Sequence, residues 1–151
     1  MGDVTHEQAN LMLRLYELRR EPRLRQARSW FIENFNAAMP EELLQKYPPG
    51  SEENTHIRMV ASYWEMCADI VNRGLIDDEF YFKSNGEAWV VWEKIKAIVP
   101  AMRAAYKNPL MFAELEALAQ RLEAWRERVA PGTNDVMRQM FQQRMQAKAA
   151  Q

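Results

Sequence analysis

The sequence has few of the residues on which metal, redox and nucleotide chemistry depend. It holds one cysteine, Cys67, and two histidines, His6 and His56, among 151 residues. A single cysteine excludes an internal disulfide and a thiolate-rich metal site. None of the 5 glycines lies in a glycine-rich loop of the kind that cradles phosphates. We therefore expect a protein that is not an enzyme and that holds no cofactor and no metal.

Long apolar runs and targeting signals are also missing. No stretch approaches the roughly 18 consecutive apolar residues that a membrane-spanning helix needs. The first residues lack the basic segment followed by an apolar one that marks a secretory signal. We therefore expect a cytoplasmic location and no membrane partner.

What the sequence does contain is helical periodicity along nearly its whole length. Apolar residues recur at intervals of three and four positions, and the strict alternation of a half-buried strand is absent. The length fits one domain. We expect a single-domain, all-α bundle over residues 1–151, with about five long and two short helices and no sheet. Residues 1–4 are expected to be disordered or frayed, and the helix over 133–151 to be weakly attached.

Prolines predict several helix boundaries. Proline suits the first turn of a helix, where its missing N–H is not needed, so helices are expected to start at Pro22, at Pro40 and at Asn108-Pro109. Aromatic and aliphatic residues at helical spacing predict one helix over 87–107. Pro100 should kink that helix, because proline cannot donate a hydrogen bond to the carbonyl one turn earlier.

The closest approach to a metal motif is Glu53-Asn54-Thr55-His56. Carboxylate-bridged dimetal centres in helical bundles need such a Glu-x-x-His pair on two helices and a further glutamate on two others. The second candidate for the pair ends in His6, close to the start of the chain. We expect Glu53 and His56 to form the exposed first turn of a helix, and metal-dependent activity at these residues remains an alternative.

Three side chains further along the same predicted helix are of reactive types. Cys67 shares a face with Trp64 and is expected to be a buried, inert thiol. Glu65 and Asp69 lie one turn apart on a neighbouring face. No motif supplies a partner for acid–base catalysis, so a buried Glu65 paired with an arginine is the favoured interpretation, and a role as general acid or base stays open.

A basic cluster is the feature with the most evident ligand. Residues 14–28 contain six arginines and two glutamates, whereas the net charge of the whole chain is −1. Four of these arginines surround the Glu21-Pro22 corner: Arg19, Arg20, Arg23 and Arg25. The start of the following helix would add free backbone N–H donors for an anion. No aromatic residue is interleaved to stack bases, so we do not expect nucleic acid as a partner. Binding of a polyanion or nucleic acid through the Arg19–Arg28 cluster is the alternative function.

The last predicted helix carries an apolar face that is rich in methionine. This face comprises Val136, Met137, Met140 and Phe141. Methionine adapts to the surfaces of partners, so the helix could dock on its own bundle or on a neighbouring chain. We expect a non-enzymatic protein–protein interaction module that self-associates, most simply as a homodimer, and that also binds an as yet unknown protein. A small-ligand pocket near Pro100 and the tryptophans is a third possibility.

Several stretches of the chain resemble a known family. They are Leu15–Leu18, Pro22–Trp30 and Tyr63–Asp77, together with a tryptophan-bearing helix that runs from Trp92 to Arg103. On these stretches the chain is similar to an uncharacterised bacterial all-helical family, a domain of unknown function, over about residues 7–128. The resemblance implies a helical domain without evident catalytic character, and it brings no activity, cofactor or site residue with it.

Overall fold

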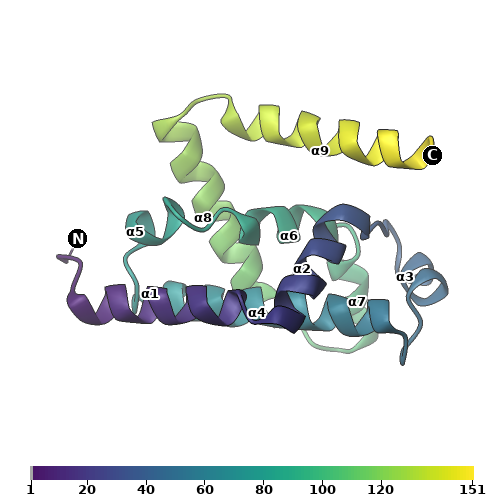
Figure 1. The fold of residues 1–151 in the computed structure, drawn as a ribbon, viewed down its shortest axis with the longest axis horizontal. Coiled ribbons are helices and arrows are strands. Elements are labelled where there is room, and N and C mark those ends of the chain that lie inside the picture. Colours follow the sequence, from purple (N-terminus) through teal and green to yellow (C-terminus); the bar gives the residue numbers. More distant parts are fainter. Residues whose placement is uncertain (1) are drawn as a thin grey trace.

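The computed structural model describes residues 2–151, and every regular element in that range is a helix (Figure 1). The described helices are α1 (His6–Arg19), α2 (Pro22–Asn34), α3 (Pro40–Lys46), α4 (Glu52–Asn72), α5 (Asp78–Phe82), α6 (Glu87–Ile95), α7 (Val99–Ala105), α8 (Ala113–Val129) and α9 (Thr133–Ala149). The predicted all-α fold is confirmed, although the helices in this range outnumber the predicted five long and two short ones.

Helix α4 lies at the centre of the packing. It packs most extensively against α2 and α8, while α6 packs against both α8 and α4. The inner face of α4 is fully buried at Val60, Trp64 and Cys67. In Figure 1, α4 runs along the lower edge of the molecule and the lower end of α8 meets it near its middle. Helix α4 also has exposed residues, among them Ser62 and Met66.

The proline-based helix starts at Pro22 and Pro40 are confirmed, since these residues open α2 and α3. Thr5 caps α1, because its hydroxyl oxygen accepts a hydrogen bond from the Gln8 N–H at 3.1 Å. Met1 lies outside the described residues, and residues 2–4 are exposed and precede α1.

The predicted single helix over 87–107 is wrong in one respect: it is broken, not merely kinked. Helix α6 ends at Ile95 and α7 starts at Val99, with a turn between them in which the Ile98 N–H donates to the Ile95 carbonyl. Pro100 lies in the first turn of α7. It cannot supply the hydrogen bond that would carry the helix through, so it starts a new helix instead.

The predicted helix start at Asn108-Pro109 is also wrong. Residues 108–112 form turns, and α8 begins only at Ala113. The residue before it, Phe112, has a left-handed backbone with φ of 56°. This conformation costs an ordinary L-residue on the order of 1–2 kcal/mol, so contacts elsewhere must hold the segment in place.

Helix α9 folds back over α6 and α8 along the upper edge of Figure 1. Arg138 of α9 forms ion pairs with Glu93 of α6 and with Glu123 of α8. The Arg138 and Arg126 guanidinium groups both lie against the buried Trp89 ring, 5.2 and 4.9 Å from its centroid. This charged and aromatic cluster joins α9 to the rest of its own chain.

No helix among the described residues combines the length and the apolar character needed to cross a membrane.

Candidate functional site

A large apolar hollow lies against the first half of α4. It has a volume of about 690 Å³ and opens between α3, α4, α7 and the start of α8. Its apolar lining comprises Leu43, Leu44, Pro49, Ile57, Ala61, Ile95, Ile98, Met102, Tyr106, Met111 and Phe112. The hollow adjoins the helix that contains Pro100, where the sequence suggested a pocket, but no tryptophan lines it.

A second hollow continues along the other half of α4. Its volume is about 610 Å³, and it shares Ser62, Met111 and Phe112 with the first. From α4 it adds Glu65, Met66, Asp69 and Arg73, and from the following segment Leu110, Ala113 and Glu114. Together the two hollows follow α4 from Asn54 to Arg73, and we call this continuous surface the α4 face.

Large apolar side chains rise from both ends of the α4 face. Leu44 and Tyr106 stand at the first hollow with 58% and 69% of their surface exposed. Leu110 at the second hollow is 76% exposed. Apolar residues gathered around a concave surface are typical of a binding site, since they leave water when a partner docks.

Charge is divided between the two ends of this face. Arg58 is the charged residue that lines the first hollow, and it is exposed and forms no ion pair within residues 2–151. The second hollow carries three carboxylates, from Glu65, Asp69 and Glu114, and one guanidinium, Arg73, which pairs with Asp69 at 3.0 Å. The α4 face is therefore positive at one end and negative at the other.

Glu65 lines the second hollow and is hydrogen-bonded to the first turn of α8. Its Oε1 accepts a hydrogen bond from the Leu115 N–H at 2.8 Å, which supplies α8 with the cap that Phe112 does not provide. The sequence favoured an arginine partner for Glu65, and the structure gives it the N-terminus of a helix instead. Its Oε2 is buried and makes no hydrogen bond within the described residues. Asp69 has the separate role of pairing with Arg73 on the surface.

Loss of this cap is expected to destabilise the fold. Replacing Glu65 with alanine leaves the Leu115 N–H without its acceptor and should lower the free energy of unfolding by about 1 kcal/mol. Urea denaturation at pH 7 measures this change. The matched control is Glu79→Ala, which removes an exposed carboxylate paired with Lys83 and should stay within about 0.5 kcal/mol of wild type. Equal losses in both variants would show that Glu65 does not act as a cap.

The same carboxyl group gives the stability a defined pH dependence. Burial raises the pKa of Glu65 above its ordinary value of 4.5, in spite of the opposing Leu115 N–H. The folded chain therefore takes up a proton more readily than the unfolded chain. Between 4.5 and the raised pKa, the contribution of Glu65 to stability falls as pH increases. Glu65→Gln, which cannot ionise, should lack this part of the pH dependence in the same denaturation experiment.

Cys67 lies among buried aromatic side chains and has no exposed surface. Burial raises the pKa of its thiol to about 11, so the thiolate that acts as a nucleophile is scarce at neutral pH. This position agrees with the prediction of a buried thiol.

The structure places Glu53 and His56 at the start of α4 as predicted, but His56 is buried, not exposed. Its ring lies 5.7 Å from the ring of Trp30, and its Nε2 lies 3.6 Å from Glu52. No group of three or more histidine, cysteine, aspartate or glutamate side chains that could hold a metal ion is found among the described residues.

The four arginines of the basic cluster do not form one site. Arg19 is partly buried and lies over the Tyr16 ring, 5.0 Å from its centroid. Arg20 and Arg25 line a hollow beside α2, and Arg23 is exposed outside it. The free donors expected at the start of α2 are partly used, because the Leu24 N–H donates to the Glu21 side chain at 2.9 Å.

The apolar face predicted on the last helix is divided by the fold. Met137 and Phe141 pack against the core of their own chain, whereas Val136 and Met140 remain exposed. A partner-binding role for Val136 and Met140 stays a prediction. The α4 face was missed, because its exposed residues come from α3, α7 and the 108–112 turns. The available signal was Met66, an apolar residue outside the buried stripe of its helix.

A comparison with known protein families identifies the family of this chain. A family model described as a domain of unknown function, DUF4760, matches residues 4–122. The chain belongs to this family. The match confirms the predicted resemblance to a domain of unknown function, and its limits lie close to the predicted residues 7–128. No curated protein and no solved structure matches the chain.

The family region contains the whole α4 face. All residues that line its two hollows lie between Leu43 and Glu114, inside the matched range. The end of α8 and all of α9 lie beyond it. The α4 face therefore lies within the DUF4760 match, and α9 packs onto the matched region from outside it.

Proposed function

We propose that this domain acts by binding and not by catalysis, and that it self-associates by pairing its α4 face with the α4 face of a second copy. The observation that supports this most directly is the distribution of charge along the face. Arg58 and Asp69 project from the same side of α4, eleven positions or about 16 Å apart. In an antiparallel pair of α4 helices related by a two-fold axis, each Arg58 would face the Asp69 of the other copy.

The residues between these two charges suit such an approach. The midpoint between Arg58 and Asp69 lies close to Ser62, which is exposed and small. A small residue allows two helices to come close together. With a two-fold axis at this point, both copies contribute the same surface patch to the interface. Each dimer would then contain two Arg58–Asp69 pairs.

The size and character of the α4 face also suit a protein partner. The residues lining both hollows approach the roughly 20–30 residues that a stable interface uses on each side. Leu44, Tyr106 and Leu110 would lose their contact with water in the dimer, which provides the main driving force. Charged residues then fix the orientation.

Charge reversal tests this arrangement. Wild type is expected to sediment as a dimer at micromolar concentration, and Arg58→Glu should weaken the dimer about tenfold or more, because each dimer loses two attractive pairs and gains two repulsive ones. Asp69→Arg should do the same. The double variant Arg58→Glu, Asp69→Arg restores opposite charges and should recover the dimer. Sedimentation equilibrium measures each association constant.

Two controls decide between surfaces. Arg23→Glu makes the same change in net charge at an exposed position on α2 and should leave the dimer intact. Met140→Glu tests the outer face of α9. A monomeric wild type, no rescue in the double variant, or dissociation caused by Met140→Glu and not by Arg58→Glu would each overturn the proposal.

A cytoplasmic location in a bacterium is part of the same proposal. It is supported by the unpaired, buried Cys67, since disulfides are rare in that compartment, and by the resemblance described from the sequence.

A further inference from the structure

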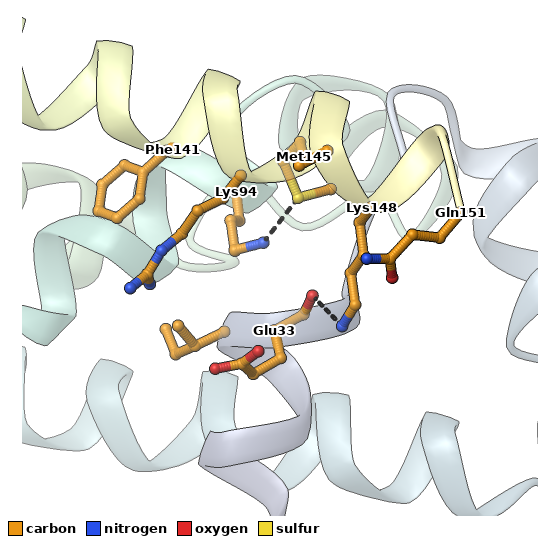
Figure 2. Close-up of a pocket in the computed structure, with 9 residues that line it drawn as sticks. Glu33, Lys94, Phe141, Met145, Lys148 and Gln151 are labelled. Carbon is orange, nitrogen blue, oxygen red and sulfur yellow. Dashed lines mark hydrogen bonds between the residues drawn. The ribbon is translucent and has the colours of Figure 1, made fainter.

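A basic hollow lies where the end of α2 meets the last turns of α9. It has a volume of about 310 Å³ and is lined by Lys94 of α6, by Arg144 and Lys148 of α9, and by Glu33 of α2. Figure 2 shows the Lys94 and Lys148 side chains reaching toward this space from two different helices. Three cationic groups thus face one carboxylate.

A second hollow adjoins the first on the outer side of α2. Its volume is about 650 Å³, and Glu33 and Lys148 belong to both. The second hollow adds Arg20 and Arg25, two members of the basic cluster identified from the sequence. Lys148 therefore stands between two groups of cations that lie far apart in the chain.

The two lysines are held in place by the end of α2. The Lys148 Nζ donates to the Glu33 carbonyl at 2.8 Å and to the Asn34 side chain at 2.6 Å. The Lys94 Nζ donates to the Phe35 carbonyl at 3.0 Å. The carbonyl end of a helix attracts cations, and an ammonium group has three donors. Both lysines are therefore positioned with a donor left for a ligand.

The cationic side chains that line these hollows outnumber the carboxylate of Glu33. Burial, followed by repulsion from the nearby Lys148, lowers the pKa of Lys94 to about 8, and Glu33 opposes this shift only in part. Arg25 and Arg144 are exposed and pair with no acidic side chain in the part of the chain that the structure describes. An anion placed here would relieve this repulsion.

We propose that the two hollows bind a small molecule that carries two or more linked phosphate groups, with one phosphate group in each hollow and Lys148 between them. Guanidinium groups match the geometry of phosphate oxygens with paired hydrogen bonds, and each hollow offers at least one. Arg20, Arg25 and Lys94 belong to the family region, whereas Arg144 and Lys148 come from α9. The site is completed only where α9 packs onto the DUF4760 domain.

Isothermal titration calorimetry with inorganic pyrophosphate and tripolyphosphate at low salt tests the site on the full chain. Arg25→Gln and Arg144→Gln remove guanidinium groups that make no contact needed for folding, and each should weaken binding about tenfold. Glu33→Gln removes the opposing carboxylate and should tighten binding. The control Arg128→Gln makes the same change in net charge at an exposed position of α8, a helix that lines neither hollow, and should leave the affinity unchanged.

A second measurement follows Lys94 itself. Bound phosphate stabilises the ammonium form, so the pKa of Lys94 should rise from about 8 when pyrophosphate is added, as read from the NMR signals of ¹³C-labelled lysine. An unchanged pKa, no binding of either phosphate, or an equal loss of affinity in Arg128→Gln and Arg25→Gln would overturn the proposal. Binding of a single-stranded oligonucleotide without binding of either phosphate would overturn it as well. The outcome is independent of the α4 face, because the two surfaces share no residue.

Discussion

Replacing Trp89 with alanine is expected to lower the free energy of unfolding by about 3–5 kcal/mol, which is typical for truncating a fully buried tryptophan. Trp89 has no exposed surface. Its indole N–H donates to the Glu123 side chain at 3.0 Å, and its ring contacts the Arg126 and Arg138 guanidinium groups. The substitution therefore removes apolar contacts, a hydrogen bond and two cation–π interactions together.

Two other tryptophan variants separate these contributions. Trp89→Phe keeps most of the buried ring and loses the hydrogen bond to Glu123, so its expected cost is about 1–2 kcal/mol. Trp125→Ala, on the same side of the domain, truncates a partly exposed ring that packs against Phe82 at 5.7 Å. Its cost should lie well below that of Trp89→Ala.

Urea denaturation, followed by circular dichroism at 222 nm, measures all three variants. The loss in free energy of unfolding should be largest for Trp89→Ala and clearly smaller for Trp89→Phe and Trp125→Ala. A Trp89→Ala loss no larger than that of Trp125→Ala would mean that the ring is not the centre of the packing between α6, α8 and α9.

Local signals in the sequence were sufficient for most helix boundaries. Pro22 and Pro40 start helices because a first-turn proline needs no N–H donor, and Gly74 ends one because it adopts a left-handed backbone with φ of 80°. Each of these effects acts within a few residues of the chain, so it is present in the sequence itself. The all-α class follows from the same short-range periodicity.

The helix boundaries that were predicted wrongly depend on contacts with residues far away in the sequence. Phe112 adopts a left-handed backbone that its residue type does not favour, and Glu65, more than forty positions earlier, caps the helix that follows it. No local pattern predicts such a pair. At Pro100 the sequence did predict a disturbance, but the choice between a kink and a break depends on how α6 and α7 pack.

The surfaces were harder to predict than the helices, for the same reason. Whether an apolar residue is a core residue or an exposed one depends on which helix covers it. Met137 and Met140 have the same type and lie three positions apart, yet one packs on the core and the other is exposed. The sequence predicted Arg20 and Arg25 as candidate anion ligands, whereas Lys148, which lines the same hollow, is more than a hundred positions away along the chain.

Removing the Glu123 carboxylate is expected to free α9 from the domain. Glu123 accepts two hydrogen bonds of 2.8 Å from Arg138 and one from the Trp89 indole. Glu123→Ala leaves Arg138 with Glu93 as its remaining acidic partner and leaves the indole N–H without an acceptor. Because Glu123 is partly exposed, we expect a cost of about 2 kcal/mol, less than for a fully buried pair.

This cost should appear first as local opening of α9, because the lost hydrogen bonds to Arg138 join α9 to α8. Amide hydrogen exchange over residues 133–149 is expected to accelerate by a factor of about 30, while exchange in α4 stays close to that of wild type. Glu127→Ala is the matched control. The Glu127 carboxylate is also on α8, and it accepts hydrogen bonds from Asn134 and from the Gly132 N–H but none from Arg138. A similar acceleration in this control would assign the effect to the α8–α9 turn and not to Arg138.

The attachment of α9 should also depend on pH in a way that Glu123 controls. Burial alone would raise the pKa of Glu123, but hydrogen bonds from Trp89 and Arg138 outweigh it and hold the pKa below its ordinary value of 4.5. The stabilising contribution of Glu123 is therefore complete above about pH 4.5 and is lost as the pH falls through the lowered value. Exchange of the α9 amides, corrected for intrinsic rates, should accelerate in wild type over this acidic range. In Glu123→Ala, α9 is already loosened at pH 7, and acidification should change its exchange much less. Parallel pH profiles for the two proteins would show that another group holds α9 in place.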